Sequence, residues 1–354
     1  MRILMVADAA SMHTRRWVEA LVSRGHDVHV ASFRYFRFDG ATFHHLPNAG
    51  LKKAGYFLAI PALRRLARRI NPDIVHAQYV TSYGFLAAAA GLSPLVTTAW
   101  GTDVLISPWK SRFYFYLAKY ALTKADAVTT VAEHMNESVA RLGVPESNIV
   151  CLPFGVDTGL FAYSPRRRQD LTSPWRVIST RNFEPIYDVR TLLDAAGILS
   201  RKGISFELIL VGSGSLEGDL RRHATEIGIA DKVLFTGRIE HGSLPKLLAS
   251  ADVFVTPARS DGNNISLNEA MSVGCFPIAT DIPANSQWIS HGQNGYLYPA
   301  GDPNALAGML EMTFKNSALI SQATLANRGI VEKRASWQHC ITATEALFMR
   351  LIPT

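Results

Sequence analysis

Two carboxylates eight residues apart, Asp261 and Glu269, enclose a segment suited to holding an anion. Between them a glycine and two asparagines precede a helix-forming run, at Gly262, Asn263, Asn264 and Ile265. The first N–H groups of a helix lack intrahelical partners and lie at the positive end of its dipole, so they bind phosphate groups. With a diphosphate there, one carboxylate can hold sugar hydroxyls and the other ribose hydroxyls.

A cation for the same anion is offered by Arg181, which follows an expected strand at 175–180. The spread charge of a diphosphate is normally held by two cations or by a metal ion. Arg259 and Arg190 are candidates for the second cation. Glycines in two turns, at Gly212 and at Gly237 before Arg238, would let the backbone approach a nucleotide.

These residues also have ordinary structural interpretations. Asp261 can be a plain helix N-cap with Glu269 on the surface, because acidic side chains often cap helices. Arg181 can be a surface arginine after a strand, and Gly212 can belong to a simple turn. The two interpretations differ in one observable respect, the burial of the carboxylates and the arginine.

The first half of the chain has its own polar residues after expected strands. His13 lies in the first strand-to-helix loop, where it can contact phosphate or another ligand group or be an unremarkable surface histidine. Trp100, Gly101 and Asp103 follow an expected strand at 95–99. We predict that His13, Trp100 and Gly101 bind a ligand.

The elements that position these residues are strands and helices in alternation. Short apolar strands separated by helices of ten or more residues predict parallel sheets covered on both faces. We therefore expect an α/β protein with two Rossmann-like doubly wound domains facing a central cleft, over 1–165 and 175–335. A Pro- and Arg-rich linker would run from Pro153 to Pro174, and residues 336–354 would form a C-terminal helix able to pack on the N-terminal domain.

Charge is distributed unevenly along the 354 residues. Residues 1–170 have 20 Lys/Arg and 12 Asp/Glu, whereas 171–354 have 16 and 17. Arg64, Arg65, Arg68 and Arg69 share one side of an expected helix at 53–70, preceded by Lys52 and Lys53. A basic amphipathic helix can lie on an anionic membrane, or it can be a solvated face over a packed core.

Other features narrow the class of protein. The three widely spaced cysteines suit a reducing compartment and have no metal-type spacing. The start of the chain does not resemble a signal peptide, and the uncharged stretch 74–102 is interrupted by Gly, Ser, Pro and Thr, so we expect a buried helix, turn and strand there. A dinucleotide dehydrogenase is disfavoured because 8–14 contains no glycine, and a phosphorylase because no pyridoxal lysine motif is apparent.

The segment 260–281 closely resembles the signature of the family-4 retaining glycosyltransferases, the "group 1" type with the GT-B fold. That signature is an acidic residue, seven residues and then Glu-Ala-Met, here with Asp261 in place of the usual Glu and Asn264 in place of a glycine. The turns at 211–214, 235–238, 292–297 and 301–303 occur in the family's order, and the resemblance covers roughly 1–315. The family's second diphosphate cation, a lysine that precedes a glycine, is absent; Ile186 or Tyr187 occupies that stretch. Trp100 replaces the family's usual histidine.

The resemblance implies a retaining glycosyltransferase that uses a UDP- or GDP-sugar without a metal or other cofactor. Asp261, Arg181 and Asp103 would be catalytic, and the donor would contact Glu269, 262–265, Gly212, Gly237 and Arg238. The acceptor would contact His13, Trp100 and Gly101, and it would be lipid-linked, a saccharide or another molecule. Nucleic acid is not an expected partner. We expect a cytoplasmic location, where the basic N-terminal half can contact the inner face of the membrane. A GT-B epimerase and a nucleotide-sugar-binding protein without transferase activity stay open as alternatives.

Overall fold

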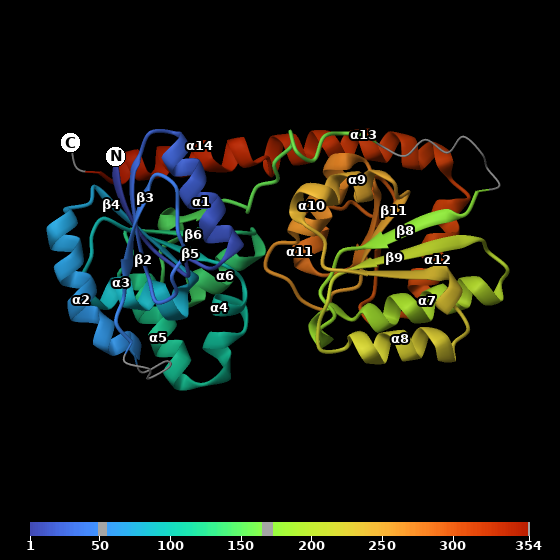
Figure 1. The fold of residues 1–354 in the computed structure, drawn as a ribbon, viewed down its shortest axis with the longest axis horizontal. Helices are drawn as coiled ribbons and strands as arrows, with labels where there is room; N and C mark the ends of the chain where they lie inside the picture. Colours follow the sequence, from blue (N-terminus) through green and yellow to red (C-terminus); the bar gives the residue numbers. More distant parts are fainter. Residues whose placement is uncertain (49–54, 165–172, 353–354) are drawn as a thin grey trace. The chain divides into compact units, whose positions relative to one another are not determined.

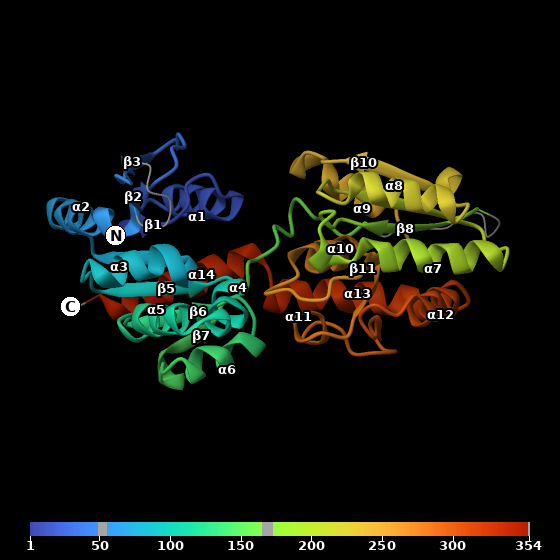
Figure 2. The same ribbon diagram turned by 90° about the horizontal axis from the view of Figure 1, so that it is seen from below.

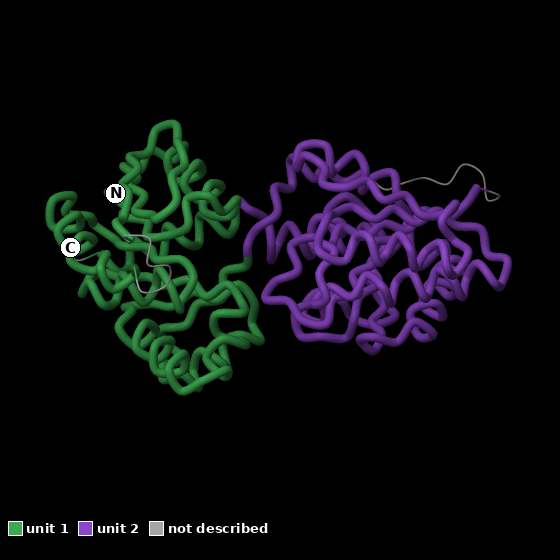
Figure 3. The backbone as a smooth tube through the Cα atoms, turned by 60° about the horizontal axis from the view of Figure 1, so that its bottom comes forward, with its two compact units in different colours: residues 1–153, 338–354 green, residues 154–337 purple. Residues whose placement is uncertain are grey.

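The computed structural model describes residues 1–48, 55–164 and 173–352. Two compact units divide the chain, Met1–Pro153 with Gln338–Thr354, and Phe154–Trp337 (Figure 3). The predicted basic residues Lys52, Lys53 and Arg166–Arg168 lie outside the described residues. Each unit contains one parallel sheet.

The first unit has a seven-stranded sheet in the order β3-β2-β1-β4-β5-β6-β7, with neighbouring strands parallel (Figure 1). The strands are β1 (Arg2–Val6), β2 (Asp27–Ser32), β3 (Ala41–His45), β4 (Ile74–Gln78), β5 (Leu95–Ala99), β6 (Ala127–Thr130) and β7 (Ile149–Cys151). The helices are α1 (Met12–Ser23), α2 (Gly55–Ile70), α3 (Phe85–Ala89), α4 (Thr102–Leu105), α5 (Arg112–Thr123), α6 (His134–Arg141) and α14 (Trp337–Leu351). Short helical turns are η2 (Tyr79–Gly84), η3 (Ser107–Lys110) and η4 (Glu146–Asn148).

The second unit has a six-stranded parallel sheet in the order β10-β9-β8-β11-β12-β13. Its strands are β8 (Trp175–Ser179), β9 (Phe206–Val211), β10 (Val233–Gly237), β11 (Val253–Thr256), β12 (Phe276–Thr280) and β13 (Tyr296–Tyr298). Its helices are α7 (Val189–Arg201), α8 (Glu217–Glu226), α9 (Leu244–Ala249), α10 (Ile265–Val273), α11 (Pro283–Ser286), α12 (Pro303–Phe314) and α13 (Ser317–Arg334). Its 3₁₀ turns are η5 (Pro185–Tyr187), η6 (Ala230–Lys232) and η7 (His241–Ser243).

Helices cover both faces of each sheet, because the central strands are apolar on both sides (Figure 2). All five residues of β4, β5 and β12 are buried. In the first unit α2 and α3 pack on one face, while Trp17 of α1 and Phe348 of α14 contact His76 on the other. In the second unit α7, α8 and α12 cover one face, and α9, α10 and α13 the other. The predicted pair of doubly wound sheets is confirmed.

The strand orders identify one crevice in each sheet. In the first sheet the chain proceeds from β1 outward to β2 and β3, then returns to β4 on the other side of β1. In the second it proceeds from β8 to β9 and β10, then returns to β11. Ligands of doubly wound sheets bind beyond the carboxyl ends of the strands at such reversals. The residues that follow β1 and β4, and those that follow β8 and β11, are therefore the first to consider.

The border between the units lies earlier than the sequence analysis placed it. We expected residues up to 165 in the N-terminal domain, whereas the chain enters the second unit at Phe154. Val156 and Phe161 are buried in the second unit's core, and Val156 forms a β-bridge with Ser336. Loop-forming residues show that helices and strands stop, but they do not show which core a loop's apolar side chains enter.

The C-terminal helix belongs to the first unit from Gln338 onward. Glu345 of α14 accepts from Arg24 Nε at 2.8 Å and lies 2.7 Å from His26 Nε2, both at the end of α1. The Arg24 and His26 contacts lower the pKa of the Glu345 carboxyl against the opposing effect of burial. This helix therefore completes the fold of the first unit, although the whole second unit separates it in sequence from residues 1–153.

The stability of the first unit should depend on pH through His76, whose pKa burial lowers to about 4. Unfolded chains protonate histidine near pH 6.5, so between about pH 6.5 and 4 the unfolded state binds more protons and stability decreases as pH decreases. At pH 5 we expect a loss of about 2 kcal/mol relative to pH 7.5 from this group. Thermal unfolding at pH 5 and pH 7.5 measures this loss of stability, and a His76→Gln variant should lose less stability between the two pH values.

A matched control for that experiment is His45→Gln, because His45 is exposed at the end of β3. This variant should retain the wild-type difference between the two pH values. An equal decrease in His76→Gln and wild type would show that other groups produce the effect.

Two elements of the first unit were not anticipated. The edge strand β3 contains mostly half-buried and exposed residues, so its apolar pattern is weak. The uncharged stretch after β4 begins with a π-helical turn, η2, before the short α3. Among the described residues, no helix combines the length and apolarity that crossing a bilayer requires.

Candidate functional site

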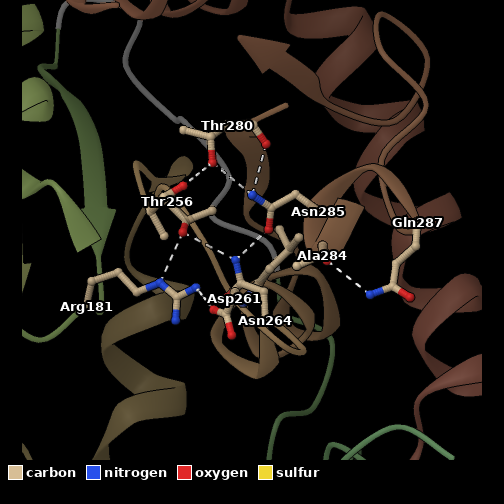
Figure 4. Close-up of polar contacts among 10 residues, drawn as sticks. Arg181, Thr256, Asp261, Asn264, Thr280, Ala284, Asn285 and Gln287 are labelled. Carbon is tan, nitrogen blue, oxygen red and sulfur yellow. Dashed lines mark hydrogen bonds and ion pairs between the residues drawn. The ribbon is translucent and has the colours of Figure 1, made fainter. Parts of the chain in front are cut away.

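The reversal in the second sheet brings Arg181 and Asp261 together (Figure 4). Arg181 lies two residues beyond β8, and Asp261 lies in the loop between β11 and α10. Arg181 Nη2 donates to Asp261 Oδ2, and Arg181 Nε donates to Thr256 Oγ1 at 3.0 Å. The two side chains are only 9% and 16% exposed. The interpretation of Arg181 as a surface arginine after a strand is therefore wrong.

The loop that carries Asp261 is held by a chain of amide and hydroxyl contacts (Figure 4). Asn264 Oδ1 accepts from the N–H of Leu267 at 3.1 Å, so Asn264 is the N-cap of α10. Its Nδ2 donates to Asn285 Oδ1 at 2.8 Å and to Thr256 Oγ1 at 3.2 Å. Asn285 in turn donates to the carbonyl of Thr280 at 2.9 Å. An asparagine at position 264 therefore joins this loop to the ends of β11 and β12.

Glu269 lies in the second turn of α10 and is 7% exposed. Its Oε1 is 3.1 Å from His241 Nε2, which belongs to η7 after β10. Because Asn264 is the cap and Glu269 is buried, the interpretation of Asp261 as a plain N-cap with a surface Glu269 is wrong. A buried carboxylate with one partner keeps lone pairs for ligand hydroxyls.

The predicted phosphate cradle needs one correction. The N–H of Ile265 already donates to the carbonyl of Asn263 at 2.9 Å, because the chain turns tightly into the helix there. Asn263 is 7% exposed, and both polar atoms of its side-chain amide lack a partner among the described residues. Gly262 lies in the same loop. The amides of 263 and 264 and the Asn263 side chain are therefore better placed to meet an anion than the Ile265 amide.

The glycine turns lie at the carboxyl ends of β9 and β10. Gly212 has φ of 150°, and its N–H donates to the carbonyl of Gly237 at 3.0 Å. A Cβ on Gly212 would collide with the carbonyl of Arg181, so the two loops are in close contact there. Arg238 Nε donates to Ser213 Oγ at 2.8 Å. Gly212, Gly237 and Arg238 thus form one corner beside Arg181.

A Gly212→Ala substitution should destabilise the second unit by more than about 2 kcal/mol and displace Arg181. An alanine at this φ is strained, and its Cβ overlaps the Arg181 carbonyl. Thermal unfolding measures the loss. Gly218→Ala on α8 is the control, since no atom lies within 4 Å of its added Cβ. Equal melting temperatures for the two variants would contradict the close-contact argument.

The structure shows which residue stands where the resemblance places the missing lysine. In the family this lysine precedes a glycine, and here Asp188 adopts left-handed φ of 45° directly before α7. Asp188 therefore occupies the glycine position, and Tyr187 the lysine position. The Arg181 guanidinium carbon lies 5.1 Å from the centre of the Tyr187 ring. Arg259 Nη2 forms an ion pair with Asp188 Oδ2 at 2.7 Å, so this second candidate cation is tied to the same loop.

Asp103 does not have the setting of a catalytic group. It is fully buried, and its carboxylate accepts from the N–H groups of Gly101 at 2.8 Å, Val80 at 2.8 Å and Trp100 at 3.0 Å. Burial raises the pKa of Asp103, and these hydrogen bonds oppose that shift. Gly101 has φ of 135°, which suits this tight loop. We therefore revise Asp103 from catalytic to positioning, because both carboxylate oxygens hold backbone amides.

His13 and Trp100 lie together in the first unit. Their rings meet edge to face with centroids 5.3 Å apart. Burial, and secondarily Arg16, lowers the pKa of His13 to about 4, so its imidazole is neutral at pH 7. Trp100 lines a cavity of about 490 Å³ beside Asp8 and Gln78, at the reversal of the first sheet.

Sequence reasoning missed several residues of both crevices. Thr256, Asn285 and His241 hold Arg181, Asn264 and Glu269 in the second unit, and Gln78 and Tyr79 border the cavity in the first. Thr256 and Gln78 could have been predicted, because each is the last residue of a buried strand. His241 could not, because it neither ends a strand nor belongs to a motif.

Comparison with known families decides the classification. A family model described as "Glycosyl transferase 4-like" matches residues 2–132, and one described as "Glycosyl transferases group 1" matches 165–330. The chain belongs to the group 1 glycosyltransferases. The two matched regions correspond closely to the two units, and the second contains every residue of the Arg181–Asp261 crevice.

Curated relatives of this group 1 glycosyltransferase are distant in sequence. The chain is 24% identical to the N-acetyl-alpha-D-glucosaminyl L-malate synthase of Bacillus anthracis over 323 residues, covering 84% of the chain and 82% of that protein. It is 27% identical to the amylovoran biosynthesis glycosyltransferase AmsK of Erwinia amylovora, over 54% of the chain and 48% of that protein. The match thus spans about half the length of the second relative.

Solved structures show the same fold. The crystal structure of Anabaena HepE in complex with UDP superposes with a TM-score of 0.81 at 17% identity, covering 99% of this chain and all of that one. Sucrose-phosphate synthase from Thermosynechococcus elongatus gives 0.81 at 19% identity, with 99% of each chain covered. The group 1 glycosyltransferase described here therefore has the GT-B fold.

Proposed function

We propose that the chain transfers a sugar, with retention of its anomeric configuration, from a UDP- or GDP-sugar to an acceptor held by the first unit. The observation that carries the proposal is the pair of buried Arg181 and partly buried Asp261 beside the N-terminus of α10, with buried Glu269 in the second turn of that helix. A cation, backbone amides and two carboxylates at a sheet reversal suit a diphosphate between a ribose and a sugar.

The chain's residues then act mainly on the leaving group. As the bond between the sugar's anomeric carbon and the diphosphate oxygen breaks, negative charge develops on that oxygen next to Arg181 and the loop amides. Electrostatic stabilisation of this charge is the main catalytic contribution. The acceptor oxygen forms the new bond on the same face, and its proton passes to the departing diphosphate. No nucleophilic side chain of the protein is required in this scheme.

Arg259 is the proposed second cation, in place of the family's lysine and without a metal ion. Its backbone N–H donates to the Ile186 carbonyl at 2.9 Å, so its loop is fastened to the loop after Arg181. Its side chain is 54% exposed and paired with Asp188. An exposed guanidinium can exchange one anionic partner for another at small cost. Arg190 is also exposed, but the contacts described here do not tie it to this loop.

The comparisons support the nucleotide-sugar part of the proposal. Structures of Anabaena HepE, which shares the fold, are described as complexes with UDP, with UDP-glucose, and with UDP and glucose. The Mycobacterium tuberculosis relative that is 30% identical over 185 residues is named a GDP-mannose-dependent mannosyltransferase. Both uridine and guanosine diphosphates are therefore reasonable first ligands.

A thermal-shift screen of UDP, GDP and their sugar conjugates tests the donor assignment. We expect one nucleoside diphosphate to raise the melting temperature, and its sugar conjugate to be hydrolysed slowly without acceptor. Binding without hydrolysis or transfer would favour the non-catalytic alternative, and formation of an epimeric nucleotide sugar would favour the epimerase. A crystal soaked with the diphosphate that shows density away from α10 would overturn the proposed site.

We also propose that the basic face of α2 associates with an anionic membrane. Arg65, Arg68 and Arg69 are exposed along α2, opposite the buried Leu63, Ala67 and Ile70; Arg64 instead donates to the carbonyl of Ala90 at 2.9 Å. Each basic residue near an anionic surface contributes about 1 kcal/mol. An Arg65/Arg68/Arg69→Glu variant should lose co-sedimentation with phosphatidylserine vesicles, whereas Arg221/Arg222→Glu on α8 should not. Equal binding of both variants would remove the membrane role.

A further inference from the structure

The cavity at the reversal of the first sheet contains a buried amide that is only half satisfied. Gln78, the last residue of β4, is 1% exposed and lines the 490 Å³ cavity. One end of its amide accepts from Thr14 Oγ1 at 3.1 Å, and its Nε2 has no partner among the described residues. A buried polar group left unpaired costs about 1–3 kcal/mol, so it points to a ligand with a hydrogen-bond acceptor.

The rest of that cavity is also polar on the β1 side. Asp8 lies two residues beyond β1, and its carboxylate pairs with Arg34 Nη1 at 3.1 Å. Ser11 and Asn48 line the same cavity. A carboxylate, an amide and a hydroxyl around one cavity match a ligand with several hydroxyl groups.

A second cavity, of about 600 Å³, adjoins the first and has a more aromatic and aliphatic lining. The two share Tyr56, Tyr79 and Ser82 in their linings, so they lie next to each other at η2. The second is bordered by aromatic and aliphatic side chains from α2, α3 and α5, among them Phe57, Phe85, Phe113, Tyr114 and Leu117. Lys110 is the one charged side chain among the described residues that line it.

The backbone between the two cavities is unusual. Tyr79 has a left-handed φ of 72°, and it opens the π-helical turn η2. A non-glycine residue in this conformation costs of order 1 kcal/mol, and π-helical turns recur at functional sites. Tyr79 OH lies 3.0 Å from Thr102 Oγ1, which fixes the ring between the cavities.

Exposed aromatic rings at the second cavity lack the cover that apolar surface normally has. Phe57 is 52% exposed and Phe113 is 61% exposed, although the Phe57 ring packs on Phe85 at 5.5 Å. Polar side chains at the sheet reversal and aromatic ones beyond it match a molecule with a polar head and an apolar chain.

We infer that these two cavities form one acceptor groove, which takes an amphipathic acceptor with a hydroxylated head at Gln78 and a hydrocarbon chain along Phe57 and Phe113. This inference rests on the proposed function, because it names the class of acceptor for that transfer. The head lies at the carboxyl edge of the first sheet, where Trp100 also borders the cavity. The occupant is one acceptor molecule and not a bilayer surface.

Calorimetric titration with alkyl β-D-glucosides below their micelle concentrations tests the groove. Affinity should increase about fourfold for each added methylene from hexyl to octyl, because each buried CH₂ contributes a near-constant free energy. The octyl glucoside should bind at least about 100-fold more tightly than methyl glucoside. A Phe57→Ser/Phe113→Ser variant should lose most of this advantage. Tyr116→Ser, equally exposed on α5 but outside the lining, should keep it.

The same variants are assayed for nucleoside diphosphate binding by thermal shift. If the wild type binds no diphosphate, the proposed function fails, whatever the glucosides show. If affinity does not depend on chain length, or Tyr116→Ser loses as much as the double variant, the groove inference is wrong. It is also wrong if the double variant loses vesicle binding but keeps its affinity for octyl glucoside, because the rings would then contact a membrane.

Discussion

Replacing Arg181 by alanine is expected to lower donor turnover by two to three orders of magnitude, the usual loss when one group that stabilises a developing negative charge is removed. Arg181 is 9% exposed and already oriented by Thr256 and Asp261, so little reorganisation is needed when charge develops beside it. Removing it also leaves the Asp261 carboxylate unpaired and partly buried. Steady-state hydrolysis of the nucleotide sugar, which needs no identified acceptor, measures the effect.

Two further variants separate charge from geometry. Arg181→Lys keeps the charge but cannot donate to Thr256 and Asp261 together, so it should recover only part of the lost rate. Arg222→Ala, at an exposed arginine of α8, should have wild-type turnover. Thermal unfolding confirms that each variant is folded. Turnover of a folded Arg181→Ala protein within tenfold of wild type would refute the assigned role.

Replacing Asp261 and replacing Glu269 should affect different quantities, turnover in the first case and nucleotide affinity in the second. Asp261→Ala should reduce turnover far more than nucleotide affinity, since Asp261 orients Arg181 and is proposed to face the sugar. Glu269→Ala should weaken nucleoside diphosphate binding about 10- to 100-fold, the value of hydrogen bonds from ribose hydroxyls to a charged acceptor. Calorimetry of UDP or GDP and the hydrolysis assay together give both quantities for each variant.

His241 offers a control for the second of these variants. His241→Gln can still donate to Glu269 from a side chain 41% exposed, so it should change nucleotide affinity only slightly. Asp261→Asn keeps the size of the side chain and tests whether its charge or its shape holds Arg181. If Asp261→Ala and Glu269→Ala lost affinity and turnover in the same proportion, the division between sugar and ribose would be wrong.

Much of the second unit was predictable because its signals are local. The strand expected at 175–180 and the helix start expected at Ile265 agree with β8 (Trp175–Ser179) and α10 (Ile265–Val273) of the structure. Apolar runs, glycine turns and the helix N-terminus each depend on neighbouring residues alone. The resemblance around Asp261 and Glu269 was equally local, and the family comparison bears it out.

Less of the first unit was predictable, because its distinctive features depend on contacts that are distant along the chain. The π-helical turn after β4 and the weakly apolar strand β3 follow no apolar period. Asp103 resembled a catalytic acid in its motif, yet its carboxylate holds three backbone amides. Whether an acidic side chain meets amides or solvent depends on the loops that fold over it.

The sequence by itself determined the two alternating α/β halves, the placement of a cation and two carboxylates after strand ends, and the basic face of α2. Each of these follows from residue type and spacing along one segment. Only the tertiary structure decided that Arg181 pairs with Asp261, that Asn264 and not Asp261 caps α10, and that α14 completes the first unit. Burial and hydrogen-bond partners depend on which segments the sheet order brings side by side, and strand order is a property of the whole chain.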